Sequence, residues 1–180
     1  MNPFDQFATT LFEQAKRFLE KANEALEQET KSAYCNVSLL LGFCSLEAHL
    51  NAIAEELTIR SGLDVLDRSI LEEKDYVLES GRFELTKKLK MYRLEDRLQY
   101  IFTRFSTSAS PTKESWWADL KKGLDLRNRL VHPKLSVDLN TQQVRRSLEA
   151  ILECLNALYL AVFSKSYPTY KRSLDSKLTF

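Results

Sequence analysis

Residues 37–57 read VSLLLGFCSLEAHLNAIAEEL, and this stretch decides the fold. A large apolar side chain recurs every third or fourth position, which places these side chains on one face of an α-helix. They are Leu39, Phe43, Leu46, Leu50, Ile53 and Leu57. Leu40, Leu41, Ala48 and Ala52 make much of the remaining surface apolar as well. A helix over residues 33–60 with this pattern is expected at the centre of a helical bundle.

The segments on either side of this stretch also follow the helical period. We expect a first helix at residues 4–26, shorter helices at 63–74, 83–92 and 94–105, a helix at 113–131 and a last one at 141–164. Asn140, with Gln143 three residues later, is typical of the capping pair that begins a helix. No alternating pattern typical of a strand is found. The sequence therefore predicts an all-α fold, an up-and-down bundle of four to five main helices plus short helices.

The chain of 180 residues suits a single domain, which we place at residues 1–166. Residues 167–180 form a basic and aromatic C-terminal tail with no clear period. Its residues Tyr167, Tyr170, Lys171 and Arg172 either contact a partner or neighbouring subunit, or belong to a disordered segment.

Composition excludes several classes of protein. The formal net charge is +1, so nucleic acid could be bound only through a local basic patch. Three cysteines without metal-like spacing and two distant histidines give no metal site, and no glycine-rich phosphate motif suggests a nucleotide cofactor. Residues 37–46, the most apolar window, are too few to span a membrane, and the N-terminus has no targeting pattern. We expect a cytoplasmic protein without cofactors.

The candidate site lies at the end of the helix predicted at 113–131. Arg127 and His132 stand five positions apart, and Pro133 then ends the helix. Arginine is a permanent cation that fits phosphate, and histidine is the side chain whose unperturbed pKa lies near neutrality. Arg127 falls within the apolar arc of this helix, whereas Asn128 and His132 lie on the polar side, about 140° away on an ideal helix. They could converge if the turn before Pro133 unwinds, or if a two-fold partner brings the Arg of one chain near the His of the other.

An arginine in an apolar arc needs a counter-charge, or the arc must be a cleft or interface. Glu47 on the central helix is a candidate, either as a buried partner of Arg127 or as a partly exposed carboxylate paired locally. His49 on the same helix is interpreted as a solvated or hydrogen-bonded histidine without a catalytic role. Trp116 and Trp117 are interpreted as core or dimer contacts, with base stacking as the alternative.

These residues resemble the motif of the HEPN superfamily, small all-α domains with an Arg, four to six intervening residues and a His. Here the motif runs from Arg127 to His132, with Asn128 as the polar residue that many members carry after the Arg. Pro133 and Lys134 are similar to the family's common ending. Residues 45–51, SLEAHLN, resemble a Leu-Glu-Ala-aromatic-x-Asn stretch of several bacterial groups, with His49 in place of the aromatic residue. The resemblance covers residues 4–166.

The resemblance implies a metal-independent endoribonuclease whose paired motifs meet across a homodimer interface. His132 would be the general acid or base, Arg127 would hold the scissile phosphate, and Asn128 would orient His132 or donate to phosphate. Arg129, Lys134, Lys121 and Lys122 would extend an RNA-binding rim, unless the lysines are only a solvated face. The substrate would be RNA and not DNA, and the products would end in 2′,3′-cyclic phosphate.

The family also suggests a toxin or antiviral role, with an antitoxin or regulatory protein as a further partner. Some family toxins carry a tyrosine two residues after the His that an antitoxin modifies, but Lys134 occupies that position here. The alternative function is a non-catalytic helical dimer that binds nucleotide, RNA or a protein. In that case Arg127 is a structural ion pair and His132 only caps its helix.

Overall fold

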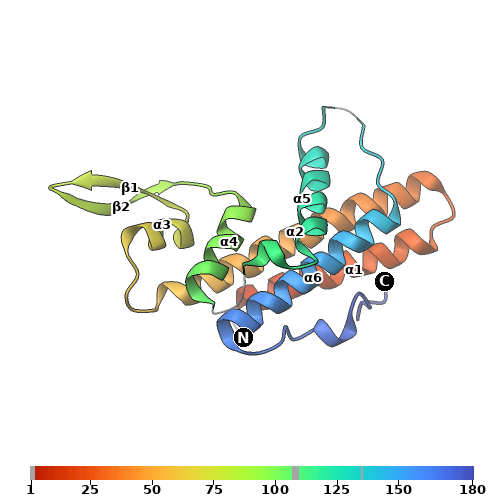
Figure 1. Cartoon of the computed structure of the whole chain (residues 1–180). Coiled ribbons are helices and arrows are strands. Elements are labelled where there is room, and N and C mark those ends of the chain that lie inside the picture. Colours follow the sequence, from red (N-terminus) through yellow and green to blue (C-terminus); the bar gives the residue numbers. More distant parts are fainter. Residues whose placement is uncertain (1–2, 107–109, 135) are drawn as a thin grey trace.

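The stripe of large apolar residues on the second helix organises the bundle. The computed structural model describes residues 3–106, 110–134 and 136–180. Helix α1 (Pro3–Glu24) and helix α2 (Gln28–Thr58) pack antiparallel along most of their length (Figure 1). All six predicted stripe residues of α2 are buried. Ser38 Oγ donates to the carbonyl of Ala15 and Ser45 Oγ to that of Ala8, both at 2.7 Å, which fixes the register of the two helices.

Helix α6 (Thr141–Phe163) is the third long helix and lies beside α1 and α2. Its start is confirmed as predicted: Asn140 Oδ1 accepts from the Gln143 N–H at 2.9 Å, and Gln143 Oε1 accepts from the Asn140 N–H at 3.1 Å. This reciprocal capping satisfies two donors that the first turn would leave unpaired. Helix α5 (Trp117–Val131) packs against α2 and α6 and crosses them steeply (Figure 1).

Gly123 allows α5 to approach α6 closely. A Cβ at this position would lie 2.6 Å from Ser147 Oγ and 2.8 Å from Ser147 Cβ. We expect Gly123→Ala to lower the free energy of unfolding by about 1–3 kcal/mol, because the overlap forces α5 away from α6. Urea unfolding measures the change. Adding Ser147→Gly removes the obstructing atoms and should restore part of the loss, whereas an unchanged midpoint for Gly123→Ala alone would contradict the close approach.

The helix predicted at residues 83–92 is wrong, because this region forms a β-hairpin. Strand β1 (Lys74–Glu79) pairs antiparallel with β2 (Arg82–Leu89), and the hairpin projects from the bundle beyond the short helix α3 (Val65–Glu72). Ser80 and Gly81 both have positive φ, 49° and 79°, as a tight two-residue hairpin turn requires. Helix α4 (Leu94–Phe105) follows with the predicted bounds.

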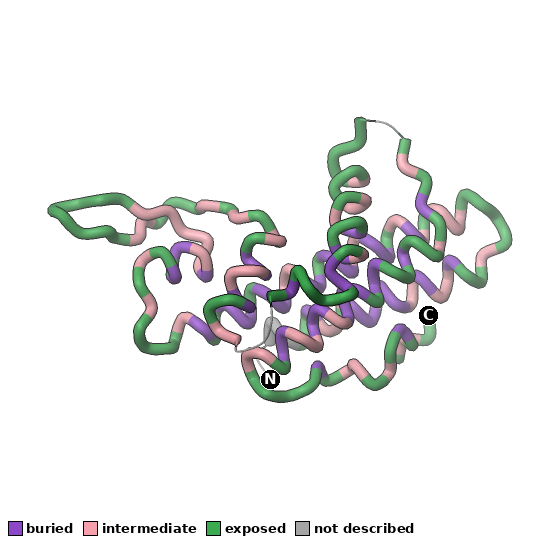
Figure 2. The backbone as a smooth tube through the Cα atoms, viewed as in Figure 1, coloured by how far each residue is buried: buried purple, intermediate pink, exposed green. Residues whose placement is uncertain are grey.

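The C-terminal segment packs against its own chain. Tyr167 and Leu174 are buried, and the short 3₁₀ helix η2 (Tyr170–Arg172) lies between them. Ser176 Oγ donates to the carbonyl of Glu13 at 2.9 Å, which ties the segment to α1. Figure 2 shows that the purple, buried parts of the tube gather along α1, α2 and α6. A second 3₁₀ turn, η1 (Pro111–Lys113), leads into α5.

Of the described helices, α2 is long and apolar enough to cross a membrane by length and composition alone. In the folded chain, however, 61% of its most apolar window is buried. That burial is the pattern of a core helix in a soluble protein. The structure thus confirms the mostly helical bundle and adds one two-stranded sheet to it.

Candidate functional site

The candidate motif lies at the exposed end of α5. The helix continues to Val131, and His132 leaves it with φ −125° and ψ 65° while its N–H still donates to the Asn128 carbonyl at 2.9 Å. The turn before Pro133 therefore unwinds only at His132 itself. His132 and Pro133 are both exposed, so this end of α5 is open to solvent.

Arg127 pairs with Glu47, the counter-charge considered for an arginine in an apolar arc. Its Nη2 lies 2.7 Å from Glu47 Oε1, and its Nη1 donates to Asn128 Oδ1 at 3.0 Å. The pair is not sealed in a core, since 23% of the Arg127 side chain and 39% of the Glu47 side chain remain exposed. Arg127 is thus both paired within one chain and accessible from outside.

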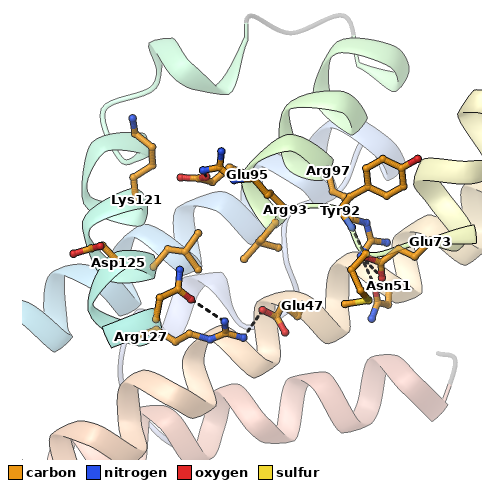
Figure 3. A pocket seen from close by; sticks show the side chains of 14 residues that line it. Glu47, Asn51, Glu73, Tyr92, Arg93, Glu95, Arg97, Lys121, Asp125 and Arg127 are labelled. Carbon is orange, nitrogen blue, oxygen red and sulfur yellow. Dashed lines mark hydrogen bonds and ion pairs between the residues drawn. The ribbon is translucent and has the colours of Figure 1, made fainter. Parts of the chain in front are cut away.

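Arg127 and Glu47 line a cleft of about 470 Å³ (Figure 3). Its floor is α2, one wall is α5, and the opposite wall is the segment that leads into α4. The lining is strongly polar: besides Asn51 it holds residues of both charges, among them Glu73, Arg93, Glu95, Arg97, Lys121 and Asp125. Ion pairs balance much of this charge: Arg127 pairs with Glu47, Arg97 with Glu73 and Arg93 with Glu95. An anion that enters the cleft therefore competes with these carboxylates for the arginines.

Arg97 is the cleft residue that the sequence analysis did not identify. Its side chain is 6% exposed, and its Nη1 contacts Glu73 Oε2 at 3.0 Å and Asn51 Oδ1 at 2.8 Å. Burial lowers the pKa of Arg97, although the carboxylates of Glu73 and Glu47 oppose the shift. Asn51 belongs to the stretch with family resemblance, but no sequence signal joined it to Arg97. The contact depends on how the turn between the hairpin and α4 places Arg97.

His132 lies outside this cleft. It lines a separate depression of about 360 Å³ with Asn128, Arg129 and Lys134. Asn128 borders both hollows, but no contact between Arg127 and His132 occurs among the residues that the structure describes. Within a single chain, the two motif residues therefore face different hollows with Asn128 between them.

The other predicted RNA-binding residues divide between two places. Lys121 lines the cleft with Arg127, whereas Lys122 does not and instead pairs with Asp119 at 3.4 Å. Arg129 and Lys134 surround His132 and are exposed. The basic rim is therefore discontinuous on one chain.

The remaining aromatic and histidine residues of interest belong to the interior. Trp116 and Trp117 are buried, as core residues should be, and cannot stack on a base. His49 is fully buried, and its ring nitrogens contact the hydroxyls of Tyr167 at 3.1 Å and Tyr159 at 3.5 Å. Among the described residues, no group of three or more His, Cys, Asp or Glu could hold a metal ion.

Comparisons with protein-family models, with curated proteins and with solved structures find no match to this chain.

Proposed function

We propose that this protein is a metal-independent endoribonuclease of the HEPN type. The proposal rests on the surroundings of Arg127. Its guanidinium is half-buried in an open cleft, Asn128 lies next to it, and the same helix ends at the exposed His132. Here the guanidinium has access to a hollow large enough for part of a nucleotide.

Arg127 has donors left for a phosphate. A guanidinium offers five N–H donors in a planar fork. Within the described chain two of them are used, toward Glu47 and Asn128, which leaves three. Glu47 and Asn128 also hold the fork in one orientation, and such preorganisation is what makes a charged donor effective in a transition state. The scissile phosphate would take two of the remaining donors.

The reaction follows from these groups. Neutral His132 accepts the proton of the RNA 2′-hydroxyl, and the 2′-oxygen attacks the adjacent phosphorus. The bond from phosphorus to the 5′-oxygen breaks, and that oxygen takes a proton from an imidazolium. The products are a 2′,3′-cyclic phosphate and a 5′-hydroxyl, with no net change in protons. Arg127 stabilises the charge that builds on the non-bridging oxygens.

The active unit of this proposal is a homodimer in the cytoplasm. Arg127 and His132 of one chain face different hollows, and a two-fold partner would supply the missing side of each. The exposed end of α5 offers an apolar contact at Val131, which is 47% exposed. An antitoxin or other regulatory protein would bind the same end of α5 if the nuclease acts as a toxin.

The test is cleavage of mixed RNA by purified protein in excess EDTA, with mapping of the fragment ends. Fragments that end in 2′,3′-cyclic phosphate support the proposal. Intact RNA over a range of protein concentrations, from a protein that sedimentation shows to be folded, would reject catalysis on general RNA.

The second candidate is a non-catalytic helical domain that binds nucleotide, RNA or protein. The ion pair between Arg127 and Glu47 favours it, since the pair lies within one chain and needs no substrate to explain it. A partly exposed pair of this kind contributes only about 0.2–1 kcal/mol to stability. Stability alone therefore gives a weak reason for placing an arginine here.

Glu47→Gln tests whether Arg127 holds phosphate in the nuclease. If Arg127 holds phosphate, the variant should lower the KM for RNA by up to about fivefold, because it removes a negative charge beside the phosphate. Steady-state cleavage of a labelled RNA measures the effect. Glu56→Gln, an exposed carboxylate on the same helix, is the matched control and should leave KM unchanged. A Glu47→Gln protein with unchanged KM and kcat would mean that the pair is purely structural.

A further inference from the structure

The β1–β2 hairpin and the residues after it form a basic segment in a nearly neutral chain. Residues 74–93 contain six basic side chains and three acidic ones, Asp75, Glu79 and Glu84, whereas the whole chain has a net charge of only +1. The six are Lys74, Arg82, Lys87, Lys88, Lys90 and Arg93. This local excess is the electrostatic pattern that a polyanion requires and that the overall composition conceals.

The hairpin also exposes apolar and aromatic side chains. The register pairs Tyr76 with Leu85 and Leu78 with Phe83, so these four lie on one face. Phe83 is 56% exposed and Leu78 is 64% exposed, and the rings of Phe83 and Tyr76 meet edge to face. Aromatic rings between basic residues suit a single-stranded nucleic acid, whose bases stack on the rings while its phosphates meet the cations.

The base of the hairpin is held rigidly beside the cleft. The Lys90 N–H donates to the Glu73 carbonyl at 2.8 Å, and Ser69 Oγ bonds the Tyr92 hydroxyl at 2.7 Å. Glu73 in turn pairs with the buried Arg97. The residues that follow, 91–93, line the same cleft as Arg127. A strand bound along the hairpin would therefore end beside the cleft, where Arg93, paired with Glu95 at 2.6 Å, forms part of the lining.

We propose that the β1–β2 hairpin is an RNA-binding arm that delivers a single strand to the Arg127 cleft. Phe83 stacks on a base, and Lys87, on the same face of β2, contacts a phosphate. Arg82 and Lys88 point to the opposite face, and their long side chains reach phosphates around the edge of the two-stranded ribbon. Asp75 lies near both Lys88, at 3.8 Å, and Lys90, at 3.7 Å. Lys90 has a different role, because its Nζ also lies 4.4 Å from the centre of the Tyr76 ring, whereas the Lys88 side chain is 79% exposed. The delivery step rests on the proposed ribonuclease function. The excess positive charge favours RNA over a protein partner for this face.

The test measures RNA binding with catalysis removed. Binding of a short fluorescein-labelled single-stranded RNA of mixed sequence is followed by anisotropy at several salt concentrations in a His132→Ala background. Lys87→Gln/Lys88→Gln should reduce the slope of log K against log salt by about 1.4, since each contact with a single strand contributes about 0.7. Phe83→Ala should weaken binding at least about fivefold. Lys165→Gln/Lys171→Gln, an equal change of charge at exposed positions away from the hairpin, should leave the slope unchanged.

An unchanged slope and affinity for the hairpin variants would overturn the arm, as would a His132→Ala parent that does not bind the RNA. If Phe83→Ala instead alters the sedimenting mass without changing RNA affinity, the face is a protein-docking surface and the arm is rejected. Cleavage by the otherwise unchanged protein is measured separately. If the unchanged protein does not cleave RNA but the hairpin variants bind RNA more weakly, the nuclease is rejected and the RNA-binding arm is supported.

Discussion

His132→Ala will reduce the kcat of RNA cleavage by about 10²- to 10⁴-fold, the usual contribution of a positioned general acid or base. The loss should appear in kcat more than in KM, because the imidazole transfers a proton in the transition state, whereas Arg127 still binds the phosphate of the substrate. Since His132 is exposed and follows the last turn of α5, the substitution removes no core contact. Circular dichroism and sedimentation should therefore match those of the unchanged protein.

Lys134→Ala is the matched control for this prediction. Lys134 lines the same depression as His132 and is also exposed, but an ammonium group is a hydrogen-bond donor only. Its loss should raise KM and leave kcat nearly unchanged. Equal kcat losses for the two variants would show that the depression only binds RNA. A His132→Ala protein with full kcat would remove His132 from the mechanism.

The sequence predicted the elements whose pattern is local and repeated. The stripe on α2 and the Asn140–Gln143 pair fix side chains within one or two turns, so both are confirmed by burial and hydrogen bonding. Residues 83–92 are predicted as a helix because Leu85, Leu89 and Tyr92 also fit a helical period. The usable signal was Ser80-Gly81, a pair that tolerates the positive φ of a tight turn.

The site was predictable only where spacing along a helix or the need for a counter-charge pointed to a residue. The helix end at His132 and the candidate partner Glu47 could be found from spacing and charge. Arg97 could not, because its contacts with Glu73 and Asn51 depend on the path of a hairpin that the sequence analysis did not recognise. The separation of Arg127 and His132, in contrast, follows from helix geometry, which puts them about 140° apart, and in the structure they line different hollows.

The packing of the C-terminal segment was harder still to predict from the sequence. Ionic contacts hold this segment, and such contacts leave no periodic pattern in the sequence. Glu13 and Lys16 of α1 are both completely buried, at 3.3 Å from each other. The segment supplies Arg172, whose Nη2 and Nη1 meet the two Glu13 oxygens at 2.8 Å and 3.1 Å. The Lys177 N–H adds a bond to Glu13 at 2.9 Å. Glu13 thus joins a buried lysine, an arginine and the backbone of the last residues.

Glu13→Ala will lower the free energy of unfolding by about 3–5 kcal/mol, because it leaves the buried Lys16 without its counter-charge. Urea unfolding followed by tryptophan fluorescence measures the loss. In the double variant Glu13→Leu/Lys16→Met both buried charges are absent, so much of the stability should return. Arg172 remains in that variant, but 39% of its side chain is exposed and water can solvate it. A loss below about 1 kcal/mol for Glu13→Ala would mean that Lys16 finds water or another partner.

The pH dependence gives an independent check of the same cluster. Burial alone would raise the pKa of Glu13, but the hydrogen bonds from Lys177 and Arg172 and the charge of Lys16 outweigh it, so the pKa of Glu13 is lowered. A carboxyl with a lower pKa in the folded state stabilises the fold above its unfolded pKa, and this contribution disappears as the pH falls through the folded pKa. The stability difference between the unchanged protein and Glu13→Ala should therefore shrink in acid.

At alkaline pH the difference should shrink for another reason. Burial already lowers the pKa of Lys16, while Glu13 opposes that shift, so removal of Glu13 lowers the pKa further. A lysine whose folded pKa lies below its unfolded value destabilises the fold while it is charged, and the penalty is relieved as the pH rises through the folded pKa. Glu13→Ala should therefore lose most stability near neutral pH and less on either side. A loss independent of pH would show that the destabilisation comes from packing and not from the buried charge.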